Sequence, residues 1–237
     1  MHDFASAREA IDTMILSNDL EGLLRQAEYL HGHLCPYVSL GVKAGQYAMK
    51  ELDRPNTGME EIVAVVECNN CFTDGIQVVT GCTFGNNALI FKDVGKTAVT
   101  LARREDGLAL RLAVRPDYRE RMLSRYPVAG PLFQKIVVER QGTPEEKHHF
   151  QHVWQAISFK ELGVPLEEQF TITRLSLTVP PYAPIFASQV CSVCGEAVME
   201  TRVRLRQGKP VCLPCAGEEY FLLTGRGMSL SRDREHG

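Results

Sequence analysis

The sequence lacks the features that would direct a chain into a membrane or out of the cell. No run of apolar residues among the 237 approaches the roughly 18 that a membrane-spanning helix needs. The stretch from Met1 to Phe4 has neither the basic nor the apolar region of a secretory signal. We therefore expect a cytoplasmic protein with no membrane partner. In that setting cysteines serve as metal ligands or catalytic groups more often than as structural disulfides.

The sequence also lacks a charge excess and a phosphate-binding loop. Lysine and arginine number 26, and aspartate and glutamate 29; the resulting net charge of −3 disfavours nucleic acid as a partner. Gly95-Lys96-Thr97 matches the end of a nucleotide-binding loop, but Ile90 stands where that motif needs its first glycine. What is present is an ordinary globular composition, 44% hydrophobic and 23% charged, which predicts a chain with a sizeable core.

The eight cysteines fall into two groups of four, and the second group has the spacing of a zinc site. It consists of two C-x2-C pairs separated by 17 residues, namely Cys191, Cys194, Cys212 and Cys215. Each pair directs two thiolates to one point, so the spacing predicts one structural zinc. We predict a hairpin between the pairs, around residues 202–209, and a short helix after them, over 216–223. This order of elements is that of a treble-clef zinc module.

A proline-rich stretch marks the boundary between two domains. Three of the twelve prolines fall between residues 180 and 184, which predicts a stiff, extended linker. We predict an α+β core domain with a Cys/His cleft over residues 1–178 and a linker over 179–187. The four-cysteine zinc finger follows over 188–224 and a flexible tail over 225–237.

Hydrophobic periodicity predicts helices that pack on a mostly antiparallel sheet in the core domain. Helices are predicted over residues 3–31 with a break at 17–19, and over 36–53, 71–80, 116–126 and 144–162. Strands are predicted over 61–67, 88–91, 98–103, 108–114 and 170–177. Gly41 and Gly45 share one helix face, where they permit close approach of another backbone. That backbone belongs either to the partner protomer of a homodimer or to another helix of the same chain.

The segment from His31 to Pro36 holds two histidines and a cysteine within five residues. Pro36 suits the first position of a helix, which places Cys35 at the N-cap, where the helix dipole lowers the pKa of a thiol. His31 and His33 come at the end of the preceding helix. Two imidazoles and a thiolate form a partial metal site.

A second segment carries polar groups on a helix face that is expected in the core. Cys71, Asp74 and Gln77 share that face, and Cys82 follows the glycine that ends the helix. Such groups predict a polar cleft shared with the first segment, into which Lys96 projects as a cation. The candidate ligands for a second metal, which is zinc, nickel or iron, are His31, His33, Cys35, Cys71 and Cys82.

Two further cysteine and histidine patterns leave alternatives open. Cys68 and Cys71 have the spacing of a redox pair, although the context is not that of a thioredoxin fold. His148, His149 and His152 lie in a charged helix, where we interpret them as solvated side chains, with an incidental metal site as the alternative.

Several ordered motifs together resemble the E-subunit family of formylmethanofuran dehydrogenase, over roughly residues 20–177. These motifs are His31–Pro36, Cys71–Gln77, Gly81–Gly85 and Gly95-Lys96. The terminal module is similar to the DksA/TraR-type finger that some members append. The resemblance implies an α+β core, a homodimer and a link to molybdenum- or tungsten-containing formylmethanofuran dehydrogenase. It also implies cleft positions at His31, His33, Cys35, Cys71, Asp74, Gln77, Cys82, Thr83 and Lys96. Cys68 and Tyr37 depart from the family pattern.

Three functions are consistent with these patterns. The first is a metal-binding accessory protein or subunit of a molybdenum or tungsten oxidoreductase system. The second is a thiolate- or metal-dependent enzyme acting on a small anionic substrate, with catalytic candidates Cys35, Cys71, Asp74 and Lys96 and with Gln77, Thr83 and Lys96 binding the ligand. The third is a regulator that acts through its zinc finger.

Overall fold

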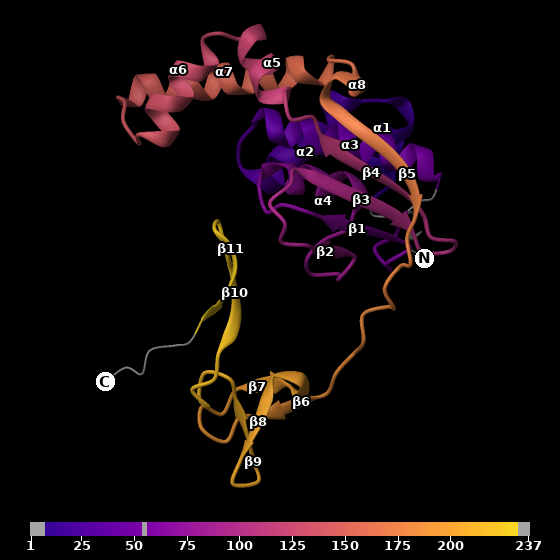
Figure 1. Cartoon of the computed structure of the whole chain (residues 1–237), viewed down its shortest axis with the longest axis vertical. Helices are drawn as coiled ribbons and strands as arrows, with labels where there is room; N and C mark the ends of the chain where they lie inside the picture. Colours follow the sequence, from indigo (N-terminus) through magenta and orange to yellow (C-terminus); the bar gives the residue numbers. More distant parts are fainter. Residues whose placement is uncertain (1–7, 54–55, 232–237) are drawn as a thin grey trace, which may run out of the picture. The chain divides into compact units, whose positions relative to one another are not determined.

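The computed structural model describes residues 8–53 and 56–231 of the chain. Contacts divide the chain into two units, residues 1–180 and residues 181–237, and we describe each unit by itself (Figure 1). In the described ranges, no helix has both the length and the apolar character needed to cross a membrane.

The first unit is built on a five-stranded sheet with the strand order β2-β1-β3-β4-β5. The strands are β1 (Ile62–Val66), β2 (Leu89–Phe91), β3 (Ala98–Arg103), β4 (Leu108–Val114) and β5 (Phe170–Ser176). The β1–β2 pair is parallel and the other three pairs are antiparallel, so the sheet is mostly antiparallel as predicted. The central strand β3 is almost entirely buried.

Helices α1 (Glu9–Ser17), α2 (Leu20–His31), α3 (Pro36–Leu52) and α4 (Cys71–Thr80) cover one face of the sheet (Figure 1). A second group gathers at one end of the sheet, namely α5 (Tyr118–Arg125), α6 (Ala129–Phe133), the π-helical turn η1 (Gln134–Val138), α7 (Pro144–Leu162) and α8 (Leu166–Gln169). The α+β class is therefore confirmed. The sequence did not predict α6, η1 and α8, each of which spans five residues or fewer.

Local capping sets the boundaries of the helices that lead to the site. Asn18 takes a left-handed conformation with φ 59° and ends α1, and the Asp19 side chain accepts a hydrogen bond from the backbone N–H of Gly22 at the start of α2. Gly32, at φ 80°, ends α2, and Pro36 begins α3. The Asn70 side chain accepts the N–H of Phe72 and so caps α4. The predicted break and the predicted starts of α3 and α4 are confirmed, whereas the start predicted at residue 3 lies outside the described residues.

Close packing between α3 and α4 depends on two glycines. A Cβ atom on Gly41 would lie 2.1 Å from the Phe72 carbonyl oxygen, and one on Gly75 would lie 2.5 Å from the Val38 carbonyl oxygen. The glycine face of α3 therefore contacts a helix of the same chain rather than requiring a partner protomer. This contact draws the first turns of the two helices together. The homodimer stays a prediction, without support from Gly41.

Gly41→Ala is expected to lower the free energy of unfolding by about 3 kcal/mol, since the new methyl group meets backbone that cannot move aside. Gly45→Ala is the matched control. Its Cβ would meet the Val79 side chain, at 3.1 Å, and no backbone of the neighbouring helix. Alanine also favours the helix, so the change should stay within about 1 kcal/mol. Urea unfolding of both variants measures the difference. Equal effects at the two positions would contradict the packing described here.

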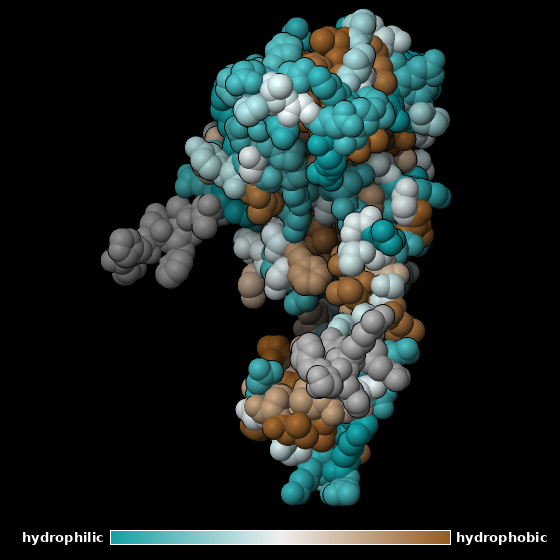
Figure 2. Space-filling model, turned by 90° about the vertical axis from the view of Figure 1, so that its left-hand side faces the viewer, coloured by the Kyte–Doolittle hydropathy of each residue, from teal (hydrophilic) through white to brown (hydrophobic). Residues whose placement is uncertain are grey.

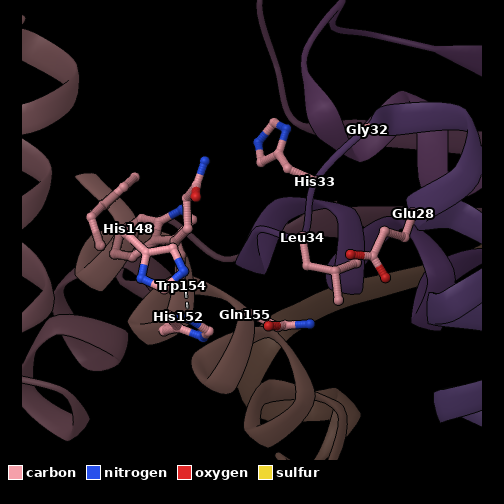
Figure 3. Close-up of a pocket in the computed structure, with 10 residues that line it drawn as sticks. Glu28, Gly32, His33, Leu34, His148, His152, Trp154 and Gln155 are labelled. Carbon is pink, nitrogen blue, oxygen red and sulfur yellow. Dashed lines mark hydrogen bonds between the residues drawn. The ribbon is translucent and has the colours of Figure 1, made fainter. Parts of the chain in front are cut away.

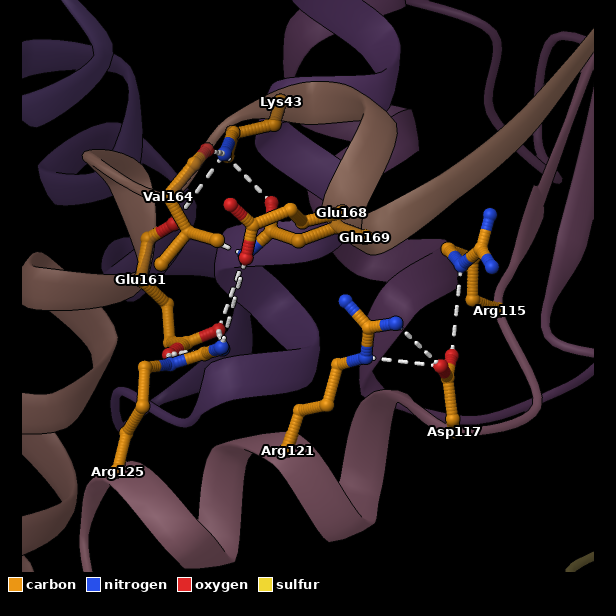
Figure 4. Close-up of polar contacts among 9 residues, drawn as sticks. All are labelled: Lys43, Arg115, Asp117, Arg121, Arg125, Glu161, Val164, Glu168 and Gln169. Carbon is orange, nitrogen blue, oxygen red and sulfur yellow. Dashed lines mark hydrogen bonds and ion pairs between the residues drawn. The ribbon is translucent and has the colours of Figure 1, made fainter.

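A buried polar network joins α3 to α7 and α8 (Figure 4). Lys43, only 5% exposed, donates to the backbone carbonyls of Val164 and Glu161 and to the side-chain oxygen of Gln169. The fully buried Glu161 carboxylate accepts from Arg125 at 3.0 Å and from the Gln169 amide at 2.9 Å. Burial lowers the pKa of Lys43 to about 8. Every buried charge in this network is thus hydrogen-bonded.

Lys43→Met is expected to cost about 2–4 kcal/mol of unfolding free energy, because it removes the donor from three acceptors while filling similar space. Lys50→Met on the same helix is the control. Lys50 is exposed and donates to Asn18, so its loss should change the free energy by less than about 0.5 kcal/mol. Chemical denaturation of both variants makes the comparison; a Lys43 variant as stable as the control would show that the network does not support the fold.

The second unit consists of short strand pairs. These are β6 (Ser188–Val190) with β7 (Ala197–Met199), β8 (Val203–Arg206) with β9 (Lys209–Cys212), and β10 (Tyr220–Thr224) with β11 (Gly227–Ser231); a 3-10 turn, η2, spans Glu200–Arg202. The hairpin predicted between the cysteine pairs is β8–β9. In the described part of this unit the buried cluster is small, consisting of Cys191, Val211 and Ala216. Large apolar side chains such as Leu205 and Phe221 are more than 70% exposed, and Figure 2 shows apolar residues in brown at the surface.

The helix expected over residues 216–223 and the flexible tail expected from residue 225 were both wrong for the described residues. Gly217 turns the chain at φ 65°, and Tyr220 to Ser231 then form the β10–β11 hairpin. The physical reason is the short turn at Gly225 and Arg226, which joins two runs of mostly apolar side chains; the Thr224 hydroxyl accepts the Arg226 N–H. The rest of the predicted tail, residues 232–237, lies outside the described residues.

Candidate metal centres

Three helix ends meet at a small cluster of metal-binding side chains in the first unit. His31 is the last residue of α2, Cys35 is the N-cap of α3, and Cys71 is the first residue of α4. One ligand atom from each of these residues lies within 4.8 Å of the other two. The α3–α4 contact places the two thiols, and the turn at Gly32 brings the imidazole to them. We call these three residues the core site.

The orientation of His31 is fixed from one side and leaves its other nitrogen without a partner. Nδ1 lies 2.7 Å from Asp74 Oδ2, and the Gln77 amide donates to the second oxygen of Asp74 at 3.1 Å. The Gln77 carbonyl oxygen in turn accepts the backbone N–H of Phe84. His31 Nε2 is buried and has no hydrogen-bond partner among the residues that the structure describes. A carboxylate that holds one imidazole nitrogen while the other stays free is typical of metal-binding histidines.

The two thiols of the core site have unequal acidity. Their mutual hydrogen bond lowers the pKa of Cys71 to about 6 and raises that of Cys35, with burial adding to the rise at Cys35 and opposing the fall at Cys71. The His31 charge lowers the pKa of Cys71 further. We expected the lowered pKa at Cys35 from its N-cap position, and that expectation was wrong. The reason is that Cys35 is only 5% exposed, and its thiol keeps the proton with which it hydrogen-bonds to the sulfur of Cys71.

Cys82 lies in the hydrophobic core and does not belong to the core site. Its Sγ donates to the Ile62 carbonyl at 3.2 Å and accepts from the Asn56 amide at 3.6 Å. Burial raises its pKa to about 11. Cys68 similarly contacts Asn70 and Thr73, and all eight cysteines are free thiols.

The remaining predicted cleft residues differ in what they contact. The His33 ring lies 4.4 Å from the His31 ring, measured between centroids, and its pKa is lowered by burial and by the His31 charge. Thr83 exchanges hydrogen bonds with Asn86 in the turn after α4. Lys96 is exposed, and its backbone N–H donates to the Glu67 carbonyl. Asp74 holds His31, and Gln77 holds Asp74. The spacing of these residues on one helix face could not show whether they bind a ligand directly or orient a residue that does.

The core site fits a transition metal. One imidazole nitrogen and two sulfurs are donors that zinc, nickel and ferrous iron accept. The unpartnered His31 Nε2 is the group such an ion would satisfy. His31, Cys35 and Cys71 would hold the ion, and three protein ligands leave a coordination position for water or another ligand.

The second unit brings its four cysteines together. The Sγ atoms of Cys191, Cys194, Cys212 and Cys215 lie within 4.8 Å of one another. Backbone N–H groups of Cys194, Cys212 and Val193 donate to Cys191 Sγ and lower the pKa of this thiol to about 6, whereas neighbouring sulfurs help raise that of Cys215 to about 12. Four thiols this close ionise together only around a cation. The donor set fits tetrahedral zinc.

Comparison with known proteins assigns each of the two units to a family. Residues 30–171 match the family described as FmdE, molybdenum formylmethanofuran dehydrogenase operon, and residues 184–221 match the prokaryotic DksA/TraR C4-type zinc finger. The chain belongs to the FmdE family and carries a DksA/TraR-type finger after its FmdE domain. The resemblance seen in the sequence motifs is confirmed.

Proteins similar to the chain include a relative of similar sequence and a solved structure of similar fold. One, from Archaeoglobus fulgidus and described as a "Probable S-adenosyl-L-methionine-binding protein", is 41% identical over 213 residues. The alignment covers 88% of this chain but 56% of that relative, so the chain spans little more than half of the relative's length. The other is the crystal structure of a tungsten formylmethanofuran dehydrogenase FmdE-like protein from Syntrophus aciditrophicus. The two structures superpose with a TM-score of 0.53 and 20% sequence identity, over 84% of this chain and 92% of the Syntrophus chain. This similarity supports the fold.

Cys194→Ser is expected to lower the zinc content of the full chain by one equivalent, because it removes one ligand of the four-cysteine site. Amide exchange should then accelerate in β6 to β9 and stay slow in β3, since the second unit has so small an apolar core. Ser192→Ala is the control, because Ser192 lies between the two ligands of the same pair and is exposed. Full zinc content in the Cys194 variant would contradict the assignment.

Proposed function

We propose that the chain is a metal-binding accessory protein of a molybdenum or tungsten oxidoreductase system, which holds an exchangeable metal ion at His31, Cys35 and Cys71. The observation that carries the proposal is His31: its buried Nε2 has no partner among the described residues, and a nitrogen of its ring lies within 4.8 Å of two sulfurs. An unsatisfied buried nitrogen costs about 1–3 kcal/mol, which a metal ligand bond removes. The family description, which refers to the operon of molybdenum formylmethanofuran dehydrogenase, supports the choice of partner.

The geometry favours holding and release over permanent structure. Three protein donors leave room for a ligand from a partner or a small molecule, whereas a closed structural site has four. Both cysteines of the core site lie at helix N-termini, where backbone N–H groups favour the thiolate form that binds metal. Asp74 and Gln77 keep the imidazole oriented while the ion is absent.

Metal analysis of the full chain tests the proposal. After loading with zinc, nickel or ferrous iron and desalting to remove weakly bound ions, wild type should retain one equivalent beyond the zinc of the finger. Cys71→Ser and His31→Ala should each lose that equivalent. Cys82→Ala is the matched control, since Cys82 is another buried cysteine of the same domain outside the core site. Circular dichroism confirms that each variant is folded, and unchanged metal content in both site variants would overturn the proposal.

Asp74→Asn should weaken the affinity of the core site by about 10- to 100-fold without abolishing binding, because the amide orients His31 less firmly than the carboxylate. Competition with a chromophoric chelator measures the affinity. Glu21→Gln, a loss of an exposed carboxylate on α2, should leave it unchanged. An Asp74 variant that binds as tightly as wild type would show that the 2.7 Å contact with His31 does not orient a ligand.

The second candidate function is an enzyme that uses the open coordination position on a small anionic substrate. Cobalt(II) in the core site provides its test, because anions that enter the coordination sphere change the cobalt absorption. A spectrum that responds to formate or phosphate favours the enzyme, and an inert spectrum favours the accessory role. S-adenosyl-L-methionine belongs in the same titration, since the Archaeoglobus relative is described as binding it.

A further inference from the structure

Two histidines on the surface of α7 are arranged as a metal chelate that the core site does not use. His148 and His152 are one helical turn apart, and their Nε2 atoms share a hydrogen bond of 3.1 Å, which a bound ion would replace. Both side chains are exposed, and their rings meet edge to face with centroids 4.3 Å apart. Two nitrogens bound to one zinc at about 2.0–2.1 Å, with angles near 90–110°, lie about 2.9–3.4 Å apart. The pair therefore has the separation that a shared ion requires.

The pair lines a pocket whose other wall includes residues 32–34, the segment between the core ligands His31 and Cys35. His148, His152, Trp154 and Gln155 line the pocket from α7, and Glu28 and His33 line it from α2 and the segment after it. Figure 3 shows the two α7 histidines on one side of the pocket and His33 on the other. The Glu28 carboxylate adds a negative charge to the wall, which favours a cation in the pocket.

His33 connects the pocket to the core site. It lines the pocket, and its ring lies 4.4 Å from the His31 ring, tilted by 37°. It is also two residues from Cys35 along the chain. An imidazole that faces the pocket on one side and a core ligand on the other is in position to hand an ion from one to the other.

We propose that His148 and His152 form a second, weaker binding site for a divalent transition metal, and that an ion captured there reaches the core site through the pocket by way of His33. The path to the core site rests on the proposed function, whereas the binding of an ion by the histidine pair does not. Two imidazoles bind more weakly than an imidazole and two thiolates, so the ion moves towards the tighter site. Each step exchanges one ligand for another without oxidation, and thiol protons leave to solvent when the sulfurs bind.

Equilibrium dialysis of the full chain against zinc tests the histidine pair by itself. In a Cys71→Ser background, which lacks a core ligand, one weakly held equivalent should remain beyond the finger zinc. His148→Ala combined with His152→Ala should remove it. His149→Ala is the matched control, since His149 is an exposed histidine of the same helix but is directed about 100° away from His148. Retention of the weak equivalent in the double variant, or its absence in the Cys71→Ser parent, would overturn the second site.

Stopped-flow loading with cobalt(II) tests the path. The chain keeps its finger zinc, and thiolate-to-cobalt absorption reports the filling of the core site alone. The double α7 variant should load about tenfold more slowly, because it no longer concentrates ions at the pocket. Its final absorption and core affinity should match wild type, and His149→Ala should load at the wild-type rate.

The two proposals fail in different ways. Equal loading rates in wild type and the double variant would overturn the path and leave the core site intact. A core site that never fills would overturn the proposed function and the path together. In that case the dialysis of the Cys71→Ser background still decides whether the α7 histidines bind zinc.

Discussion

The contact between the backbones of α3 and α4 is the constraint on which the core site depends. Gly41 and Gly75 let the two helices approach until a single added methyl group would collide with a carbonyl oxygen. Because Cys35 caps one helix and Cys71 begins the other, this approach fixes the separation of the sulfurs. Backbone N–H groups of Tyr37 and Val38 oppose the rise in the pKa of Cys35, and the N–H of Cys71 contributes to the lowered pKa of its own thiol. Packing and ligand chemistry are thus set by the same pair of helix ends.

The sequence predicted most of this architecture because its signals are local. Pro36, Asn70 and Gly81 mark helix ends through the conformations that they favour, and the helices begin and end where those residues stand. The C-x2-C pairs likewise carry their geometry within four residues. Such features depend on neighbours in the chain, so they can be inferred from one sequence.

What the sequence did not predict depends on contacts between distant segments. Cys82 follows α4 as closely as Cys71 begins it, yet it faces Ile62 in the sheet, and no local pattern distinguishes the two. Asp74 was expected to act in the cleft and instead holds His31, which depends on where α2 ends relative to α4. Strand β10 was mistaken for part of a helix because its apolar residues suit either structure, and β11 was mistaken for part of a flexible tail. A partner element decides each of these cases.

The chain order of the core ligands has a consequence for synthesis on the ribosome. His31, Cys35 and Cys71 all precede β2, whereas α7, which carries one wall of the pocket, begins only at Pro144. His31 and Cys35 are separated only by the turn after α2, whereas α3 and β1 lie between Cys35 and Cys71. The emerging chain therefore contains all three donors long before α7 exists to form its wall of the pocket. An ion can thus meet these donors on the nascent chain before the path that we propose through the pocket has formed.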